Sequence, residues 1–386
     1  MSRAPAPRSR AREAGLRIPG MPPGPFNAIT DVPGVKVGHS TLWSGEGPLV
    51  PGSGPVRTGC TAIVLGPGNT FRAKFPAAVH VLNGFGKAVG LPQVVELGEI
   101  ETPILLTNTL NVGRVADALL DYLLQLNPDV GTETGTINPV VLECNDSELN
   151  DIRGRHVGRR EVFDALESAS GNEVAEGVVG AGTGMRCYGH KGGIGTSSRI
   201  VGVPRGAGDE ELWEGEDTYV LGALVMSNFG TWEDFRLIGA PVGSLLPAPD
   251  GQPADPGGSV AVVLVTDAPV DARQLGRIAQ RGALGLGRTG SIASNGSGDF
   301  IVAVSTNERI PHSPGGYRAK RDVFIDGHPG INAIFRAAVE ATEEAVINSL
   351  FVADTVSGRD GNISPGLPVD DCLAIVDGIF EGSDGC

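Results

Sequence analysis

Short apolar runs alternate with glycine-rich turns along most of the chain, and this pattern predicts strands. The predicted strands lie at 34–38, 60–65, 103–106, 139–142, 177–180, 200–203, 219–226, 259–266 and 300–305. Apolar residues spaced three and four positions apart predict helices instead, because that spacing places them on one helix face. The predicted helices cover 111–126, a segment after 156 that includes Val162 and Leu166, 271–286 and 330–351.

The order of these elements predicts a mixed α+β fold built of packed layers. Strands before and after residue 259 would share one sheet system, so we expect residues 26–386 to form a single domain made of two segments. The stretches 206–217 and 246–258 are polar or rich in Pro and Gly, and both are expected to be surface loops. A hydrophobic content of 40 % with 19 % charged residues fits a compact globule rather than a disordered chain.

The charge of the chain limits its partners. A net charge of −15 argues against nucleic acid, because phosphate binding needs a basic face. No apolar run approaches the roughly 18 residues of a membrane span, so we expect no membrane partner. Residues 1–25 are expected to form a disordered leader rather than a secretory signal, since no apolar segment follows their basic side chains. These basic residues are Arg3, Arg8, Arg10, Arg12 and Arg17.

The cysteines and histidines suggest neither a disulfide framework nor a metal site. The chain has 5 cysteines, an odd number, without CxxC spacing, and its 6 histidines are scattered. We therefore expect a cytoplasmic protein that needs no metal or organic cofactor. The glycine-rich segments 180–185 and 191–199 lack the spacing of a phosphate-binding loop, so they are expected to let backbones approach closely rather than to hold a nucleotide.

Ser259 is the most informative residue of the chain. The turn-forming segment 256–258 brings this hydroxyl to the first position of a buried apolar strand. Cleavage of the Gly258–Ser259 bond would give Ser259 a free α-amine beside its own hydroxyl, so one residue would hold both nucleophile and base. An α-amine titrates near pH 8, and about a tenth of it is neutral at pH 7 and able to accept the hydroxyl proton. Taken alone, the segment is also typical of a loop that enters a strand.

Two further segments carry polar groups that suit this chemistry. Asn228 follows the apolar run 219–226, and a side-chain amide at a strand end can donate a hydrogen bond to a developing oxyanion. Ser297 and Asp299 precede the strand at 300–305, and their spacing of two places both side chains on one face of an extended backbone. We expect this pair to face Ser259, orient its amine and relay protons. Each segment taken alone also fits an ordinary turn.

Acidic side chains gather just after the predicted strand 139–142. Residues 143–151 contain Glu143 and Glu148 among several acids. Such a cluster could be a solvated loop. It could also bind the ammonium group of a substrate, because carboxylates recognise a free amine by charge-assisted hydrogen bonds.

Together, in this order, the motifs resemble the DmpA/BapA-type self-processing serine aminopeptidases, which include the L-aminopeptidase/D-esterase and β-aminopeptidase enzymes. The resemblance runs from Asn27 to about Gly378. The segments that carry it are 27–39, 57–63, 180–185, 191–196, 227–230 and 295–299.

This resemblance implies a four-layer αββα sandwich, similar to that of N-terminal-nucleophile hydrolases but with different connectivity. It implies autocatalytic cleavage between Gly258 and Ser259 into chains 1–258 and 259–386, which stay associated in a homo-oligomer. By position, Ser259 matches the nucleophile and Asn228 the oxyanion donor, while Ser297 and Asp299 match the pair beside the nucleophile. The implied activity is release of N-terminal residues (L-, D- or β-amino acids) from short peptides, amides or esters.

One position departs from the family pattern. Relatives can carry a tyrosine near Glu148 that helps to hold the oxyanion, whereas a carboxylate would repel that charge. Either the alignment shifts by a residue or two, or Asn228 and backbone N–H groups act without the tyrosine. Two other functions stay open: a self-processing acyl transferase that resembles the ornithine acetyltransferases, which use a threonine nucleophile, and a binding scaffold that is never processed.

Overall fold

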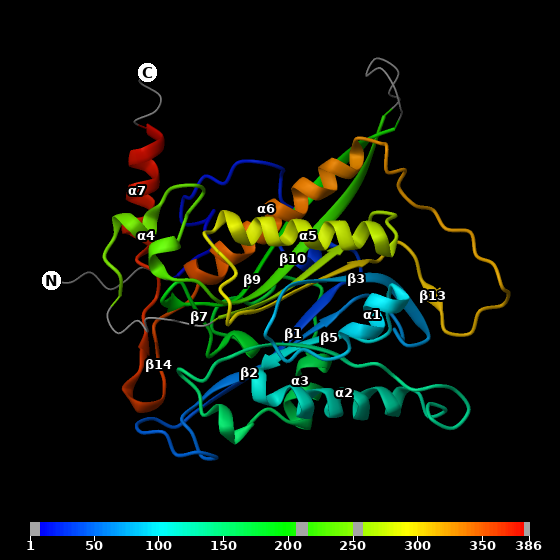
Figure 1. The fold of residues 1–386 in the computed structure, drawn as a ribbon, viewed down its shortest axis with the longest axis horizontal. Coiled ribbons are helices and arrows are strands. Elements are labelled where there is room, and N and C mark those ends of the chain that lie inside the picture. Colours follow the sequence, from blue (N-terminus) through cyan, green and yellow to red (C-terminus); the bar gives the residue numbers. More distant parts are fainter. Residues whose placement is uncertain (1–7, 206–214, 250–257, 382–386) are drawn as a thin grey trace.

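The computed structural model of the chain describes residues 8–205, 215–249 and 258–381. Two sheets lie face to face, and each is covered on its outer side by a pair of helices (Figure 1). This is the expected αββα sandwich. The loop segments 206–214 and 250–257, on which two sequence predictions fall in part, lie outside the described residues.

The larger sheet has seven strands in the order β13-β3-β12-β11-β10-β9, with β4 paired to β3. Its strands are β3 (Ala73–Gly84), β4 (Glu99–Ile100), β9 (Gly193–Pro204), β10 (Glu216–Asn228), β11 (Ser259–Thr266), β12 (Gly298–Ser305) and β13 (Ile310–Pro311). The pair β11–β12 is parallel, whereas the other pairs in this sheet are antiparallel. Strands from both sides of residue 259 therefore share one sheet, as the sequence predicts.

The smaller sheet has the order β1-β2-β5-β6. Its strands are β1 (Lys36–Ser44), β2 (Val56–Val64), β5 (Ile104–Asn108) and β6 (Val140–Cys144). Short paired strands elsewhere are β7 (Arg186–Cys187), β8 (His190–Lys191), β14 (Val356–Ser357) and β15 (Ile363–Ser364). Single 3₁₀ turns lie at Ile29–Asp31, Thr109–Asn111, Ile152–Gly154, Gly180–Gly182, Trp232–Asp234 and Arg359–Gly361.

Helices cover both outer faces. Helices α5 (Ala272–Arg288) and α6 (Gly330–Phe351) pack on the larger sheet, and α2 (Val112–Leu126) and α3 (Arg159–Glu167) pack on the smaller one (Figure 1). The remaining helices are α1 (Leu91–Leu97), α4 (Val242–Leu245) and α7 (Val369–Glu381). Helix α5 begins with a capping box, because the Asp271 side chain accepts from Gln274 N at 2.7 Å and the Gln274 side chain accepts from Asp271 N at 3.2 Å.

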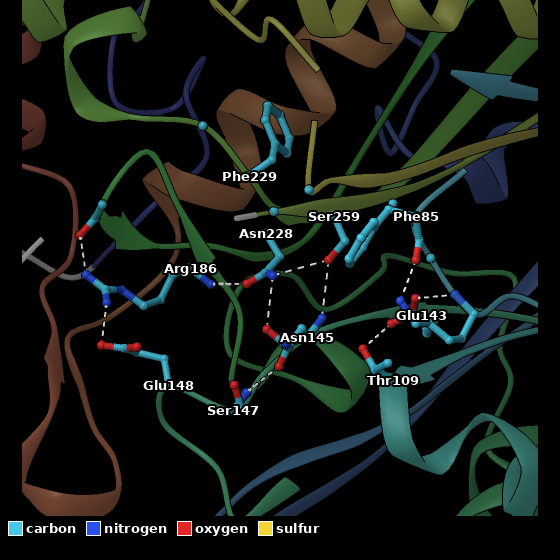
Figure 2. Close-up of a pocket in the computed structure, with 17 residues that line it drawn as sticks. Phe85, Thr109, Glu143, Asn145, Ser147, Glu148, Arg186, Asn228, Phe229 and Ser259 are labelled. Atoms are coloured by element: carbon cyan, nitrogen blue, oxygen red, sulfur yellow. Dashed lines mark hydrogen bonds and ion pairs between the residues drawn. The ribbon is translucent and has the colours of Figure 1, made fainter. Parts of the chain in front are cut away.

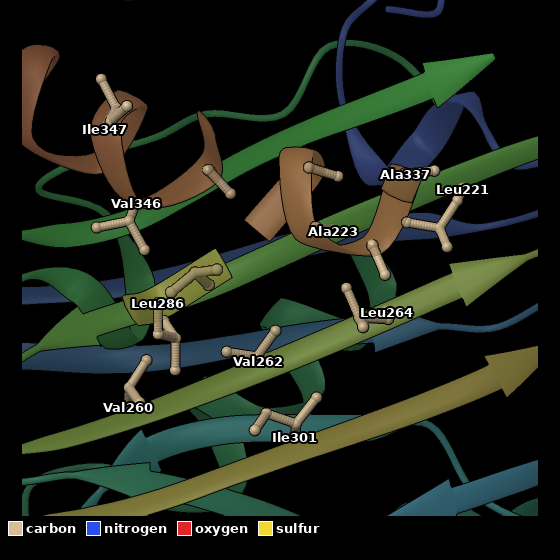
Figure 3. Close-up of a cluster of buried hydrophobic side chains, with 14 of the residues drawn as sticks. Leu221, Ala223, Val260, Val262, Leu264, Leu286, Ile301, Ala337, Val346 and Ile347 are labelled. Carbon is tan, nitrogen blue, oxygen red and sulfur yellow. The ribbon is translucent and has the colours of Figure 1, made fainter. Parts of the chain in front are cut away.

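Strand β11 is buried on both faces, which explains its continuous apolar run. Val260, Val262 and Leu264 belong to the cluster beneath α5 and α6 (Figure 3). Ala261, Val263 and Val265 belong instead to the cluster between the two sheets. Because each fully buried valine side chain contributes roughly 1.5–3 kcal/mol, this strand anchors its first residue firmly.

The structure differs from the predicted elements in several places. The run 177–180 is no strand, because Gly177 and Gly180 adopt φ of 74° and 50° and turn the chain. Strand β9 extends seven residues further toward the N-terminus than the predicted 200–203. This glycine-rich part lies so close to α6 that a Cβ at Gly195 would meet Ala345 O at 1.9 Å. Helix α6 is buried nearly all round rather than on one face, since α5 and residues of the N-terminal segment pack against it.

The expectation of a disordered leader is wrong for residues 8–25. Ala11 is fully buried, and its N–H donates to Asn348 Oδ1 at 3.1 Å. Arg10 and Arg12 form ion pairs at 2.7 Å with the buried carboxylates of Glu176 and Glu344. Arg10 and Arg12, two of the basic residues that suggest a mobile tail, therefore attach this segment to the domain. Residues 1–7 lie outside the described part of the chain.

Candidate active site

Ser259 lies where three strands of the larger sheet meet. It is the first residue of β11 and pairs with Asn228, the last residue of β10. On its other side it pairs with Gly298, the first residue of β12. The antiparallel and parallel pairings bring these three positions to one sheet edge, although they are distant in the sequence. The predicted neighbourhood of Ser259, Asn228 and the 297–299 segment is therefore present.

The residue before Ser259 adopts a backbone conformation that favours glycine. Gly258 has φ of 153°, and a Cβ there would lie 3.1 Å from Ser297 Oγ and 3.4 Å from Phe229 Cα. The Gly258 carbonyl accepts a hydrogen bond from Gly298 N at 3.3 Å. This carbonyl is therefore fixed and polarised directly beside the Ser259 hydroxyl.

Two N–H groups converge on the Ser259 hydroxyl oxygen (Figure 2). Asn145 donates its backbone N–H to Ser259 Oγ at 3.2 Å, and Asn228 donates from Nδ2 at 3.3 Å. The amide of Asn228 is held in this orientation, because Arg186 N donates to its Oδ1 at 2.9 Å. Its Nδ2 also donates to Asn145 O at 3.0 Å. Both donors are therefore fixed before any substrate binds.

Ser297 and Asp299 form a buried pair at the start of β12. Ser297 Oγ donates to Asp299 Oδ1 at 2.5 Å, so the two side chains share a face as their spacing predicts. Burial raises the pKa of the Asp299 carboxyl, and the hydrogen bond from Ser297 partly opposes this effect. Within the described residues, Asp299 Oδ2 has no hydrogen-bond partner. Through Ser297 Oγ, which would lie 3.1 Å from a Cβ at Gly258, the pair adjoins the Gly258–Ser259 junction.

Ser259 opens onto a cavity of about 370 Å³. Its lining residues are Phe85, Gly86, Lys87, Thr109, Glu143, Asn145, Ser147, Glu148, Arg186, Gly189, Asn228, Phe229, Gly230, Gly258, Ser259, Gly296 and Gly298. Both candidate substrate-binding acids are among them, but they are not one acidic cluster. Glu143 is buried and accepts from Lys87 N at 2.8 Å and from the Thr109 hydroxyl. Glu148 is partly exposed and forms an ion pair with Arg186 at 2.9 Å.

The other acids of segment 143–151 point away from the cavity. Asp146 is fully buried, and desolvation raises its pKa to about 7. Asp151 is also buried, where it accepts from the His156 ring at 3.0 Å. The sequence pattern therefore located the cavity wall correctly but could not separate its cavity-facing acids from its structural ones.

Two residues at the cavity, Asn145 and Arg186, are not marked as site residues by the sequence pattern. Asn145 acts through its backbone N–H, which every residue except proline carries, so no residue-type signal marks it. Arg186 directly follows the glycine-rich segment 180–185, which is expected to let backbones approach closely and is one of the segments that carry the family resemblance. Its position next to this segment was the only sequence feature that could have indicated a role for Arg186 at the site.

The described residues contain no group of three or more His, Cys, Asp or Glu side chains that could hold a metal ion. Cys60, Cys144, Cys187 and Cys372 are buried and free. Among the helices of the described segments, none has the length and apolar character needed to cross a membrane.

Ser259 is thus held by two N–H donors at the start of β11, after a glycine and next to a Ser–Asp pair. The model of peptidase family S58 matches residues 27–364. The chain belongs to peptidase family S58. A curated relative, the β-peptidyl aminopeptidase BapA of Sphingosinicella xenopeptidilytica, is 40 % identical over 384 residues, covering 96 % of this chain and 92 % of that protein.

Solved structures of the family share the whole fold. The PH0078 protein of Pyrococcus horikoshii OT3 has a TM-score of 0.88 at 48 % identity, covering 96 % of this chain and 99 % of the other. The L-aminopeptidase D-Ala-esterase/amidase of Ochrobactrum anthropi, described as a variant of the Ntn hydrolase fold, has a TM-score of 0.86 at 33 % identity with the same coverages. The expected family and fold are thus confirmed. This S58 chain is a serine-type aminopeptidase.

Proposed function

We propose that Ser259 is the N-terminal nucleophile of this aminopeptidase and is released by cleavage of its own Gly258–Ser259 bond. The observation that carries the proposal is the convergence of Asn145 N–H and Asn228 Nδ2 on Ser259 Oγ at the cavity wall. The oxyanion forms on the carbon that bonds to Oγ, so donors that meet at Oγ lie next to the place where its negative charge develops.

Self-cleavage begins when Ser259 Oγ adds to the Gly258 carbonyl carbon. Gly298 N–H stabilises the resulting oxyanion, since it already binds the Gly258 oxygen at 3.3 Å. The C–N bond then breaks, and the amine takes the hydroxyl proton, which leaves an ester between Gly258 and Ser259. Water hydrolyses that ester to a Gly258 carboxylate and a free Ser259 hydroxyl, now beside a free α-amine.

In peptide hydrolysis the α-amine of Ser259 accepts the hydroxyl proton as Oγ attacks the substrate carbonyl. The amine then returns this proton to the leaving nitrogen, and water hydrolyses the acyl-enzyme. Ser297 and Asp299 orient the amine and lower the cost of its charged form, because Ser297 Oγ would lie 3.1 Å from a Cβ at Gly258 and is hydrogen-bonded to the Asp299 carboxyl. Asn228 and the Asn145 N–H would hold the oxyanion without the tyrosine that relatives can carry near position 148. Glu148, at that position, is paired with Arg186 instead.

The two product chains would remain associated. Strand β11 lies in the middle of the larger sheet, with hydrogen-bonded neighbours on both sides. We propose that pairs of chains 1–258 and 259–386 assemble further into a homo-oligomer in the cytoplasm. Exposed apolar side chains of Phe85 and Ile292 offer surface for such assembly, and size-exclusion chromatography tests it.

Substrates are proposed to be short peptides, amides or esters with a free N-terminal amine. Because relatives are named for β-peptidyl and L-aminopeptidase activities, both β- and L-aminoacyl substrates should be tested. The decisive assay is hydrolysis of a panel of β-, L- and D-aminoacyl p-nitroanilides by purified protein. The acyl-transferase alternative predicts acetyl transfer to ornithine without hydrolysis, and the scaffold alternative predicts neither reaction.

Glu143 is proposed to bind the substrate ammonium group. Its carboxylate is buried, faces the cavity and is positioned by Lys87 N and Thr109. Glu143→Gln should raise KM and lower kcat/KM by about ten- to a hundredfold, because a charge-assisted hydrogen bond becomes a neutral one. Steady-state kinetics on the best p-nitroanilide measure this change. The exposed acid Glu133 provides the control, and Glu133→Gln should match the wild type. Equal KM values for both variants would exclude this role.

A further inference from the structure

On the side away from Glu143 the cavity is lined by a cationic side chain, Arg186, which is ion-paired with Glu148. Among the described residues that line it, Lys87 and Arg186 are cationic. Lys87 lies on the Glu143 side, because its N–H donates to Glu143 Oε1 at 2.8 Å. Figure 2 shows Glu143 and Arg186 on opposite sides of Ser259. The nucleophile therefore lies between a carboxylate and a guanidinium.

The guanidinium of Arg186 is held from two directions. Nη1 donates to Glu148 Oε1 at 2.9 Å, and Nη2 donates to Gly189 O at 3.3 Å. The side chain is 14 % exposed, so its charge is only partly screened by water. A guanidinium has five N–H donors, and these contacts use two of its three nitrogens. Nε is buried and, within the described residues, has no hydrogen-bond partner, so the donors left for a second carboxylate are the second N–H groups of Nη1 and Nη2.

The charges at the two ends of a free peptide are complementary to those of this cavity: an ammonium group at one end and a carboxylate at the other. With its ammonium group at Glu143 and its scissile carbonyl at Ser259, the leaving portion extends past Asn228 toward Arg186. An extended chain spans roughly 3.5 Å per residue, and Arg186 lines the same cavity as Ser259, so the carboxylate of the leaving portion extends along the wall that carries the guanidinium. A free carboxylate needs such a partner, because the chain carries a net charge of −15 and two acids line the cavity.

We propose that Arg186 binds the C-terminal carboxylate of the leaving portion, which makes the enzyme selective for free short peptides over their C-terminal amides. This inference rests on the proposed function, since it takes the position of the scissile bond from it. Arg186 is a specificity residue in this role. Glu148 orients its guanidinium and competes with the substrate carboxylate for it.

The test compares two substrates that differ only in the carboxylate: β-alanyl-L-alanine and β-alanyl-L-alaninamide, with the corresponding L-alanyl pair beside them. Wild-type protein should show kcat/KM at least about tenfold higher for the acid, as a charge-assisted contact provides. In Arg186→Met this ratio should fall toward one. In Glu148→Gln it should rise, because the competing carboxylate is gone.

Two other cations provide matched controls. Lys87→Met removes the second cavity cation and should leave the acid-to-amide ratio unchanged. Arg160→Met changes an exposed arginine on α3 and should leave both rate constants unchanged. The inference is overturned if the wild type does not favour the acid, if Arg186→Met keeps the preference, or if Lys87→Met abolishes it.

The p-nitroanilide panel separates failure of this inference from failure of the proposed function. Hydrolysis of p-nitroanilides without a preference for the acid would overturn the carboxylate site alone. Absence of hydrolysis for every substrate would overturn the proposed function itself, and with it the position of the scissile bond on which Arg186 depends.

Discussion

Ser259→Ala is expected to leave one uncut polypeptide of 39.7 kDa with no peptidase activity. The hydroxyl removed is the atom that both attacks the Gly258 carbonyl and forms the acyl-enzyme, so processing and turnover fail together. The loss in turnover should be on the order of a millionfold, as for removal of other catalytic nucleophiles. Intact-mass spectrometry measures the chain, and the p-nitroanilide assay measures the activity.

The exposed serine on α4 is the matched control. Ser244→Ala should yield the same two fragments and the same rate as the wild type, because Ser244 lies away from the cavity. A Ser259→Ala protein that is cut at the 258–259 bond, or that hydrolyses substrate, would disprove the proposed nucleophile. A circular dichroism spectrum like that of the wild type would show that its inactivity does not come from misfolding.

Asn228→Asp is expected to lower kcat by about a hundred- to a thousandfold with little change in KM. Aspartate keeps the oxygen that accepts from Arg186 N but loses the amide donor aimed at Ser259 Oγ. It also places a negative charge beside the developing oxyanion. The lost transition-state stabilisation is roughly 3–4 kcal/mol, which exceeds the effect expected for the Glu143 substitution.

Asn228→Ala separates the missing donor from the added charge, and it should also lower kcat strongly. The exposed Asn172 offers a neutral comparison, since Asn172→Ala removes the same amide far from the cavity. Single-turnover kinetics locate the effect in the chemical step. If both Asn228 variants kept the wild-type kcat, Asn145 N–H and other backbone groups would have to supply the oxyanion hole without it.

The sequence predicted many of the main elements because their local patterns are strong. The helix at 330–351 was predicted with its observed bounds, and the strand at 259–266 likewise. Strand β3 was missed, since Pro76 and small residues interrupt the apolar pattern that marks a strand. The N-terminal segment was misjudged because Arg10 and Arg12 have buried acidic partners more than 150 residues away, which local composition does not reveal.

At the candidate site, too, the residue types could be predicted from the sequence but their spatial arrangement could not. The residue types at Ser259, Asn228, Ser297 and Asp299 suggest nucleophile chemistry only in combination, because each segment taken alone also fits an ordinary turn. Their spatial relation depends on strand pairing. An antiparallel partner and a parallel partner of β11 bring positions 228 and 298 to Ser259, and no local pattern encodes that register.

From the sequence alone came the family, the layered α+β fold, the candidate nucleophile with its glycine, and the absence of metal-binding motifs. Only the tertiary structure decided which groups meet: that Asn145 supplies a backbone donor, that Glu143 and Glu148 serve different sides of the cavity, and that Arg186 faces it. The physical reason is that side-chain chemistry is a property of each residue, whereas hydrogen-bond geometry and burial arise from pairings between segments far apart in the chain.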